Sequence, residues 1–161
     1  DLVKESIFNL IQHSNKININ INNSLVLDLF AGSGSFGIEC LSRGAKEVFF
    51  FENYINTINI LEKNIKSLKN IDNYKIFKSD CFNFLKSDKI LELKFDLIFI
   101  DPPFKELKIN EIIDNIFEKK LLKKKGAIII HRHKKDSVQL SKKINIFEVR
   151  TYGISKIFFG N

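Results

Sequence analysis

Apolar positions follow two alternating patterns along the chain. A spacing of three to four residues predicts helices with one buried face, and short continuous apolar runs between them predict buried strands. The expected helices cover residues 2–13, 36–43, 54–68, 81–87, 109–122 and 136–143. The expected strands cover residues 24–29, 47–51, 74–78, 95–100, 126–130, 145–150 and 156–159.

The order of these segments predicts the fold class. Strands and helices alternate along most of the chain, which is typical of an α/β fold whose parallel sheet carries helices on both faces. The last two strands are joined by too short a link for a helical crossover, so we expect one of them to run antiparallel. The length of 161 residues and the lack of an internal repeat favour a single domain, residues 1–161.

Composition narrows the class of protein only slightly. A hydrophobic fraction of 44% and 16 Phe indicate a packed globular protein. The net charge of +7 suits a nucleic-acid partner, but a Lys-rich solvated surface would explain it equally well. Cys40 and Cys81 have neither metal-site nor disulfide spacing. With no apolar run of the roughly 18 residues that a membrane span needs, we expect a cytoplasmic monomer with reduced thiols.

The first chemical motif is the Gly-rich segment after the strand at 24–29. Gly32, Gly34 and Gly37 satisfy G-x-G-x-x-G, a pattern that lets the backbone approach a nucleotide cofactor. That pattern does not separate a nicotinamide cofactor from S-adenosylmethionine (SAM), and a tight turn without a ligand would share it. Asp28 ends the strand just before the glycines. Its carboxylate would repel a pyrophosphate but suits the ammonium and sulfonium groups of SAM.

Two further acids follow the next two strands. Glu52 lies where an acid accepts hydrogen bonds from ribose hydroxyls. Asp80 is placed to reach an adenine amine, although an N-cap of the following helix is a competing interpretation. The other residues expected to bind the cofactor are neighbours of these acids and of the glycines: Phe30, Ala31, Ser33, Asn53 and Cys81.

The second motif is Asp101-Pro102-Pro103-Phe104, where an apolar strand stops abruptly. An aryl amine is a poor nucleophile because its lone pair is delocalised, and a carboxylate and a carbonyl that accept its two N–H bonds localise that pair. The paired prolines fix the backbone and remove competing donors. Phe104 offers an aromatic face on which a flipped base can stack. We therefore expect these four residues to hold an amino group for direct attack on a methyl donor, rather than to form only a proline-terminated strand.

A basic stretch, His131-Arg132-His133-Lys134-Lys135, follows the strand at 126–130. It lies at the same sheet edge and is expected either to contact RNA phosphates or guide a base, or to form a solvated loop. We expect no metal site, because no third ligand is evident and the two histidines are expected to point to opposite sides of a continuing strand.

These motifs resemble the bacterial 16S rRNA guanine-N2 methyltransferases of the RsmD type over nearly the whole chain. The matching segments are residues 4–9 (KESIFN), 26–45 (VLDLFAGSGSFGIECLSRGA), Asp80, Asp101 to Phe104, and Tyr152-Gly153. The resemblance implies a seven-stranded Rossmann-like sheet of a class-I methyltransferase. It also implies methyl transfer from SAM to N2 of a guanine, in 16S rRNA or in the assembling 30S subunit.

The resemblance also implies a role for each matched residue. Asp28, Phe30, Gly32, Ser33 and Gly34 would line the SAM pocket, Glu52 and Asp80 would hold its ribose and adenine, and Asp101 to Phe104 would hold the guanine. Family members carry a basic hairpin and an Arg-Pro-Thr element before the matched helix, so we expect part of the RNA-binding surface to be missing before residue 1. They also commonly have an acid where this chain has His131.

Other functions remain open at this stage. DNA-adenine N6 and protein-glutamine methyltransferases use the same tetrapeptide, but glutamine enzymes favour Asn before the prolines and DNA enzymes usually carry added target-recognition segments. A nicotinamide oxidoreductase shares the glycine pattern, and Asp28 and the paired prolines argue against it. A non-catalytic RNA-binding module is disfavoured because the binding acids and the tetrapeptide are all present.

Overall fold

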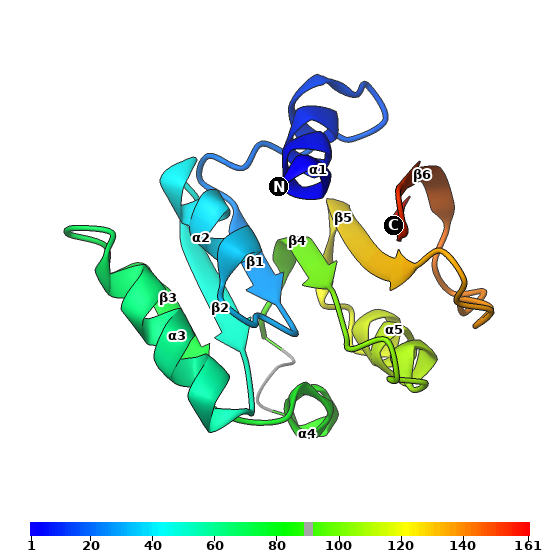
Figure 1. Cartoon of the computed structure of the whole chain (residues 1–161). Helices are drawn as coiled ribbons and strands as arrows, with labels where there is room; N and C mark the ends of the chain where they lie inside the picture. The colour runs from blue at the N-terminus through cyan, green and yellow to red at the C-terminus, as the bar shows by residue number, and fades with distance from the viewer. Residues whose placement is uncertain (89–91) are drawn as a thin grey trace.

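The computed structural model describes residues 1–88 and 92–161. Its strands form one seven-stranded sheet in the order β3-β2-β1-β4-β5-β7-β6 (Figure 1). The helices are α1 (Leu2–His13), α2 (Ser35–Ser42), α3 (Ile55–Lys66), α4 (Cys81–Lys86) and α5 (Ile109–Glu118). The strands are β1 (Leu25–Asp28), β2 (Glu47–Phe51), β3 (Tyr74–Phe77), β4 (Phe95–Ile100), β5 (Leu122–His133), β6 (Ile146–Tyr152) and β7 (Ser155–Gly160).

Strand direction confirms the predicted fold class. Strands β1 to β5 pair in parallel, and β7 runs antiparallel to both of its neighbours, β5 and β6. The chain leaves β1 towards β2 and β3, then returns to the other side of β1 as β4. This reversal of strand order leaves a crevice beyond the carboxyl ends of β1 and β4, where open α/β sheets bind their ligands.

Helices cover both faces of the sheet, and the alternation of side chains along each strand supplies both cores. On one face, α1, α2 and α3 pack against residues such as Val26, Leu97 and Ile129. On the other, α4 and α5 pack against residues such as Ile98 and Ile130. The ring of Phe36 in α2 stacks on Phe8 of α1 and on Phe99 of β4, with centroids 5.2 and 4.0 Å apart. The stack joins both helices to the sheet next to the crevice.

Two predicted boundaries are wrong, the end of α5 and the start of β5. Helix α5 was expected to reach residue 122, but it ends at Glu118, and Lys120 adopts a left-handed φ of 53°. Strand β5 therefore begins at Leu122, and it takes in the lysine run and extends to His133.

The helix expected over residues 136–143 is absent. Polar side chains of α5 bind the backbone of this segment in place of helical hydrogen bonds. Asn110 accepts from the N–H of Ser141 at 2.7 Å and donates to the carbonyl of Gln139 at 2.8 Å. Tertiary contacts thus satisfy backbone groups that a helix would have satisfied internally.

Candidate active site

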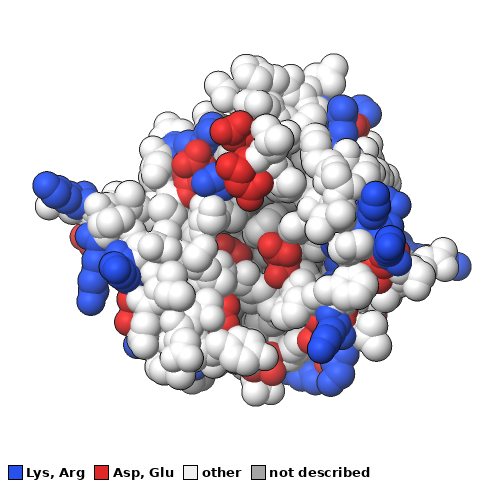
Figure 2. Space-filling view, in the orientation of Figure 1, with Lys and Arg blue, Asp and Glu red and all other residues white. Residues whose placement is uncertain are grey.

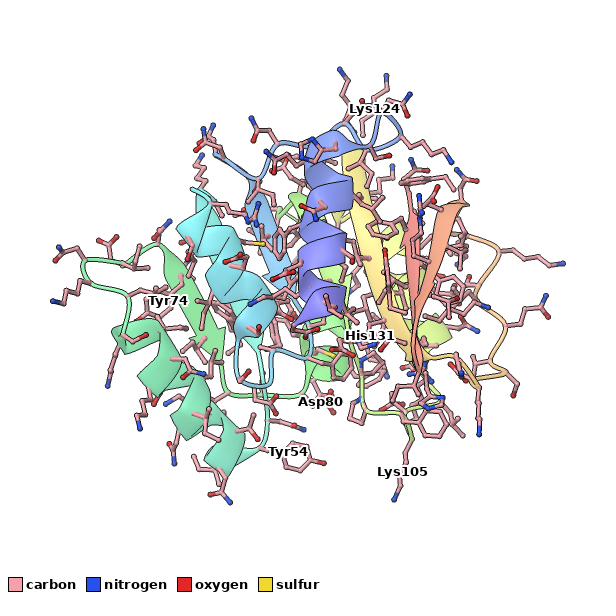
Figure 3. All side chains as sticks on the ribbon, turned by 45° about the horizontal axis from the view of Figure 1, so that its top comes forward. Tyr54, Tyr74, Asp80, Lys105, Lys124 and His131 are labelled. Atoms are coloured by element: carbon pink, nitrogen blue, oxygen red, sulfur yellow. The ribbon has the colours of Figure 1, made fainter. Side chains whose placement is uncertain are left out.

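A cavity of about 610 Å³ opens at the carboxyl ends of the central strands. Figure 2 shows this face: acidic side chains lie in the hollow at its middle, and Lys and Arg side chains lie mainly towards its margins. Figure 3 shows that Asp80 and His131 lie at the same end of the sheet. The cavity lies where the order of the strands reverses, which is the expected place for a ligand.

Side-chain alternation brings three functional residues to one face. Asp28, Asp101 and His131 each stand two residues beyond an apolar residue that packs under α1, α2 and α3. Residues two apart on a strand share a face, so all three side chains belong to that side, and all three line the cavity.

Asp28 is a buried carboxylate without a partner. It is 1% exposed, and neither oxygen makes a hydrogen bond within the described residues. Burial raises its pKa to about 8, with a further contribution from the charge of Asp101, while the nearby backbone N–H of Gly37 lowers it in part without reaching hydrogen-bond geometry. A buried acid left unpaired at a cavity wall is suited to a cationic ligand group.

The glycine loop needs two left-handed residues. Gly32 and Gly34 have φ values of 57° and 85°, a region that other residues adopt at a cost. A Cβ at Gly34 would stand 2.3 Å from the side chain of Leu61 in α3, whereas a Cβ at Gly32 would meet no atom within 4 Å. Gly34 therefore allows close helix packing, and Gly32 leaves room in the cavity that it lines.

Glu52 holds the glycine loop in place. One carboxylate oxygen accepts from the N–H of Gly32 at 3.0 Å, and the other accepts from the N–H groups of Asn53 and Tyr54 at 3.0 and 3.1 Å. The sequence predicted a ribose-binding acid and not this loop contact. Glu52 also lines the cavity, and its Oε2, which among the described residues accepts only from Gly32, can still accept from a ligand hydroxyl.

Asp80 caps α4, as the competing interpretation predicted. Its Oδ1 accepts from the N–H of Phe82 at 2.8 Å. Asp80 and the ring of Phe82 both line the cavity, which gives this wall an acceptor beside an aromatic face. Capping and ligand binding are compatible, because a carboxylate has a second oxygen.

Asp101 lies beside His131, which is itself held from β7. The Oδ1 of Asp101 is 3.1 Å from Nδ1 of His131, and Nε2 of His131 is hydrogen-bonded to Oγ of Ser155 at 2.8 Å, at the start of β7. Because a carboxylate can only accept, the Nδ1 position of His131 is placed to donate to Asp101 when it carries a proton. The expected proton acceptor of the reaction is therefore oriented by β5 and β7.

The tetrapeptide separates the main cavity from a smaller one of about 190 Å³. Phe104 lines only the smaller cavity, and its ring meets His133 edge-on with centroids 5.1 Å apart. His131 and His133 both line this cavity. The expectation that they point to opposite sides is wrong, since residues two apart in a strand share a face.

Arg132 is buried on the other face of β5 and is not a solvated phosphate-binding residue. It is 3% exposed, its Nε donates to Asp136, and its Nη2 donates to the carbonyl of Glu106 at 3.2 Å. Arg132 and the backbone N–H of Val138 hold the pKa of Asp136 below its usual value, against the opposing effect of burial. Arg132 thus ties the loop after the tetrapeptide to the end of β5.

Comparison with known proteins places the chain in a family. The family model described as Conserved hypothetical protein 95 matches residues 1–161. Putative rRNA methyltransferase YlbH of Bacillus subtilis is 32% identical over 160 residues, which cover 98% of this chain and 83% of that protein. Ribosomal RNA small subunit methyltransferase D (RsmD) of Haemophilus influenzae is 33% identical over 155 residues, 96% of this chain and 77% of that protein. This chain belongs to the RsmD-type methyltransferase family.

Solved structures agree with the family assignment. A putative methylase from Haemophilus influenzae is 31% identical with a TM-score of 0.80, over 99% of this chain and 88% of that chain. A putative methyltransferase complexed with SAH shares the fold alone, with a TM-score of 0.76 at 16% identity over 99% of this chain and 49% of that chain.

The structure brings together most of the predicted RsmD-type site. Three of the predicted residues do not line the main cavity: Gly34, Cys81 and Phe104. Cys81 is buried in the core under α4, and burial raises the pKa of its thiol to about 12. The predicted residues that line the cavity are Asp28, Phe30, Ala31, Gly32, Ser33, Glu52, Asn53, Asp80, Asp101, Pro102 and Pro103.

Sequence reasoning missed other lining residues of this RsmD-type site. Lys4 of α1 reaches the cavity, as do Tyr54, Thr57 and Phe82. Phe82 and Tyr54 each follow a predicted acid by two residues, so their closeness to Asp80 and Glu52 was a usable signal. Lys4 had no such signal, because only the packing of α1 against the sheet brings it to the crevice.

Neither a metal site nor a membrane-spanning helix is found among the described residues. Within residues 1–88 and 92–161, no group of His, Cys, Asp and Glu side chains is arranged to hold a metal ion. In the same ranges, no helix has the length and apolar character needed to cross a bilayer.

Proposed function

We propose that this chain transfers a methyl group from SAM to the exocyclic N2 amine of a guanine in 16S rRNA of the small ribosomal subunit. The observation that carries the proposal is the unpartnered buried carboxylate of Asp28 in a cavity whose wall also holds Asp101 and Pro102. A buried acid that a cationic cofactor would ionise thus adjoins acceptors for an amine. Membership of the RsmD-type family supports rRNA as the substrate.

The lining residues fit SAM. Asp28 offers its carboxylate to the cationic groups, Glu52 offers acceptors to ribose hydroxyls, and Asp80 with Phe82 offers an acceptor and an aromatic face to adenine. When bound, SAM supplies an electrophilic methyl group. Because Gly32 has no side chain, the space next to the loop stays open.

The acceptor amine is oriented by the tetrapeptide. Asp101 and the carbonyl of Pro102 accept its two N–H bonds, which localises the nitrogen lone pair and fixes its direction. Asp101 is itself held by His131, so the carboxylate does not need to reorganise. After transfer the amine loses a proton to Asp101 or to water. Most of the rate enhancement comes from positioning, with no covalent enzyme intermediate.

The rRNA substrate indicates where the enzyme works. We infer a monomeric enzyme that acts in the cytoplasm, where ribosomal subunits are assembled.

The Asp101→Ala variant tests the division between cofactor and acceptor sites. SAM should raise the melting temperature of both wild type and variant by mass action, and NAD should raise neither. The variant should lose methyl transfer by at least about a hundredfold, because the amine is no longer oriented. Stabilisation by NAD alone would contradict the SAM site, and retained activity would remove Asp101 from the mechanism.

A further inference from the structure

An apolar and basic surface borders the smaller cavity on the side of β5 and β7. Three of its apolar side chains are largely exposed: Phe104 at 58%, Leu107 at 73% and Ile154 at 64%. His133 contacts the Phe104 ring, and the neighbouring residues Lys105, Lys134 and Lys135 are exposed. We call this surface the mouth patch; its residues are Phe104, Lys105, Leu107, His133, Lys134, Lys135 and Ile154.

The mouth patch is held together although its three segments are far apart in sequence. The N–H of Lys134 donates to the carbonyl of Ile154 at 2.8 Å, which joins the end of β5 to the turn before β7. Arg132 donates to the carbonyl of Glu106, which joins the same strand to the loop after the tetrapeptide. A surface that exposes apolar groups on a fixed backbone is a common feature of binding sites.

The charge of the patch indicates the class of partner. None of its lysines forms an ion pair with a carboxylate of the described chain, whereas several lysines elsewhere do, such as Lys78 with Glu62. Unpaired ammonium groups on the same segments as an exposed aromatic ring match single-stranded nucleic acid, whose phosphates bind the cations and whose bases stack. Double-stranded RNA would not offer its base faces to Phe104 and Leu107.

We propose that the mouth patch binds the unpaired nucleotides that flank the methylated base, so that the RNA strand reaches the site over the ends of β5 and β7. This inference rests on the proposed function, and it adds to it the surface over which the RNA strand reaches the site. A second basic surface exists: the run Lys123 to Lys125 at the amino end of β5. Figure 3 shows Lys124 at the end of the molecule opposite Lys105 and His131, and the proposal gives that run no part in RNA binding.

The two ends of β5 provide a matched pair of variants. Lys134→Glu/Lys135→Glu and Lys124→Glu/Lys125→Glu replace the same number of exposed lysines and change the net charge equally. Binding of a fluorescein-labelled single-stranded RNA is measured by anisotropy at several salt concentrations. We expect the first variant to weaken binding about tenfold or more at low salt and to reduce the salt slope by about 1.4, the loss of two phosphate contacts. The second should remain within about twofold of wild type.

Apolar contacts are tested separately. Leu107→Ser should weaken binding without changing the salt slope, because it removes no charge. Ile60→Ser is the control, since Ile60 is also exposed, at 51%, but lies on α3. The melting temperature and its rise with SAM should be unchanged in all four variants, which shows that the fold and cofactor site are intact.

Several results would overturn the mouth patch. Equal weakening by both lysine variants would mean that overall charge drives binding, and stronger weakening by Lys124→Glu/Lys125→Glu would place the RNA at the opposite edge. If neither lysine variant weakens binding, or if the wild type shows no salt-dependent RNA binding, the mouth patch does not bind RNA. A protein partner would then be the remaining ligand of the patch. If the wild type methylates RNA while Lys134→Glu/Lys135→Glu binds it normally, only this inference fails. Methylation of DNA or protein in place of RNA would defeat the proposed function itself.

Discussion

At the scale of single residues, the negative charge of Asp28 has opposite effects: it lowers the stability of the fold, and it serves the binding of a cationic cofactor. Its carboxyl is buried without a hydrogen-bond partner, and its pKa is about 8 in the folded chain against 3.8 ordinarily. The folded state therefore favours the neutral acid. Below about pH 4 the acid is protonated in both the folded and the unfolded state, so its ionisation does not affect stability. As the pH rises towards 8 the folded state loses stability, and above 8 the loss is constant.

The Asp28→Asn variant should therefore be more stable than wild type in the absence of cofactor. The gain in free energy of unfolding should be up to about 5 kcal/mol at pH 8 and should shrink towards pH 5. Urea denaturation at the two pH values measures it, with the exposed Asp72→Asn as the control. SAM binding should be lost at the same time. A variant less stable than wild type at pH 8 would show that Asp28 is not an unpaired buried acid.

His131 affects the reaction through another residue. Its Nδ1 lies 3.1 Å from Oδ1 of Asp101 and its Nε2 is hydrogen-bonded to Ser155, so we assign it as a positioning residue for the acceptor amine. His131→Ala should lower kcat by about tenfold or more and leave SAM affinity nearly unchanged, because the carboxylate loses its fixed direction. His131→Asn, which keeps a donor near the place of Nδ1, should restore part of the loss. A rise in KM with unchanged kcat for either variant would contradict this role.

At the scale of elements, Gly32 and Gly34 both adopt a left-handed conformation but have different roles. Replacing each of them by Ala distinguishes the two roles. Gly34→Ala adds a clash with Leu61 to the backbone strain and should lower stability by about 2–4 kcal/mol. Gly32→Ala has only the strain, about 1–2 kcal/mol, but its methyl group would enter the cavity. Thermal unfolding with and without SAM should therefore show the larger stability loss for Gly34→Ala and the larger affinity loss for Gly32→Ala. Equal effects of the two on both readouts would contradict this division.

Elements with strong periodicity could be predicted from the sequence, and elements shaped by tertiary contacts could not. Helix α3 and strand β4 lie within two residues of their expected ends, because a buried stripe or a buried run determines them. The segment 136–143 has helix-compatible residues, but Asn110 of α5 binds its backbone in an extended form. No local pattern shows such a partner. Likewise, the left-handed Lys120 that ends α5 early has no Gly or Asn to mark it.

At the scale of the whole molecule, strand order brings the predicted motifs together. Asp28 and Asp101 lie 73 positions apart in the chain and yet stand at the carboxyl ends of adjacent strands, β1 and β4. Sequence reasoning could predict that both lie at the same sheet edge, because carboxyl ends of parallel strands share one edge. It could not predict the contact between His131 and Asp101 or the burial of Arg132. Both depend on strand β5 extending to His133, beyond its expected end at residue 130.

The central claim is methyl transfer to N2 of a guanine in 16S rRNA. The most direct measurement incubates the protein and tritiated SAM with 30S subunits, naked 16S rRNA or DNA, followed by digestion and separation of the nucleosides. We expect label in N2-methylguanine from the ribosomal substrates and none from DNA, and no label with the Asp101→Ala variant. Label in N6-methyladenine, or label confined to protein, would contradict it.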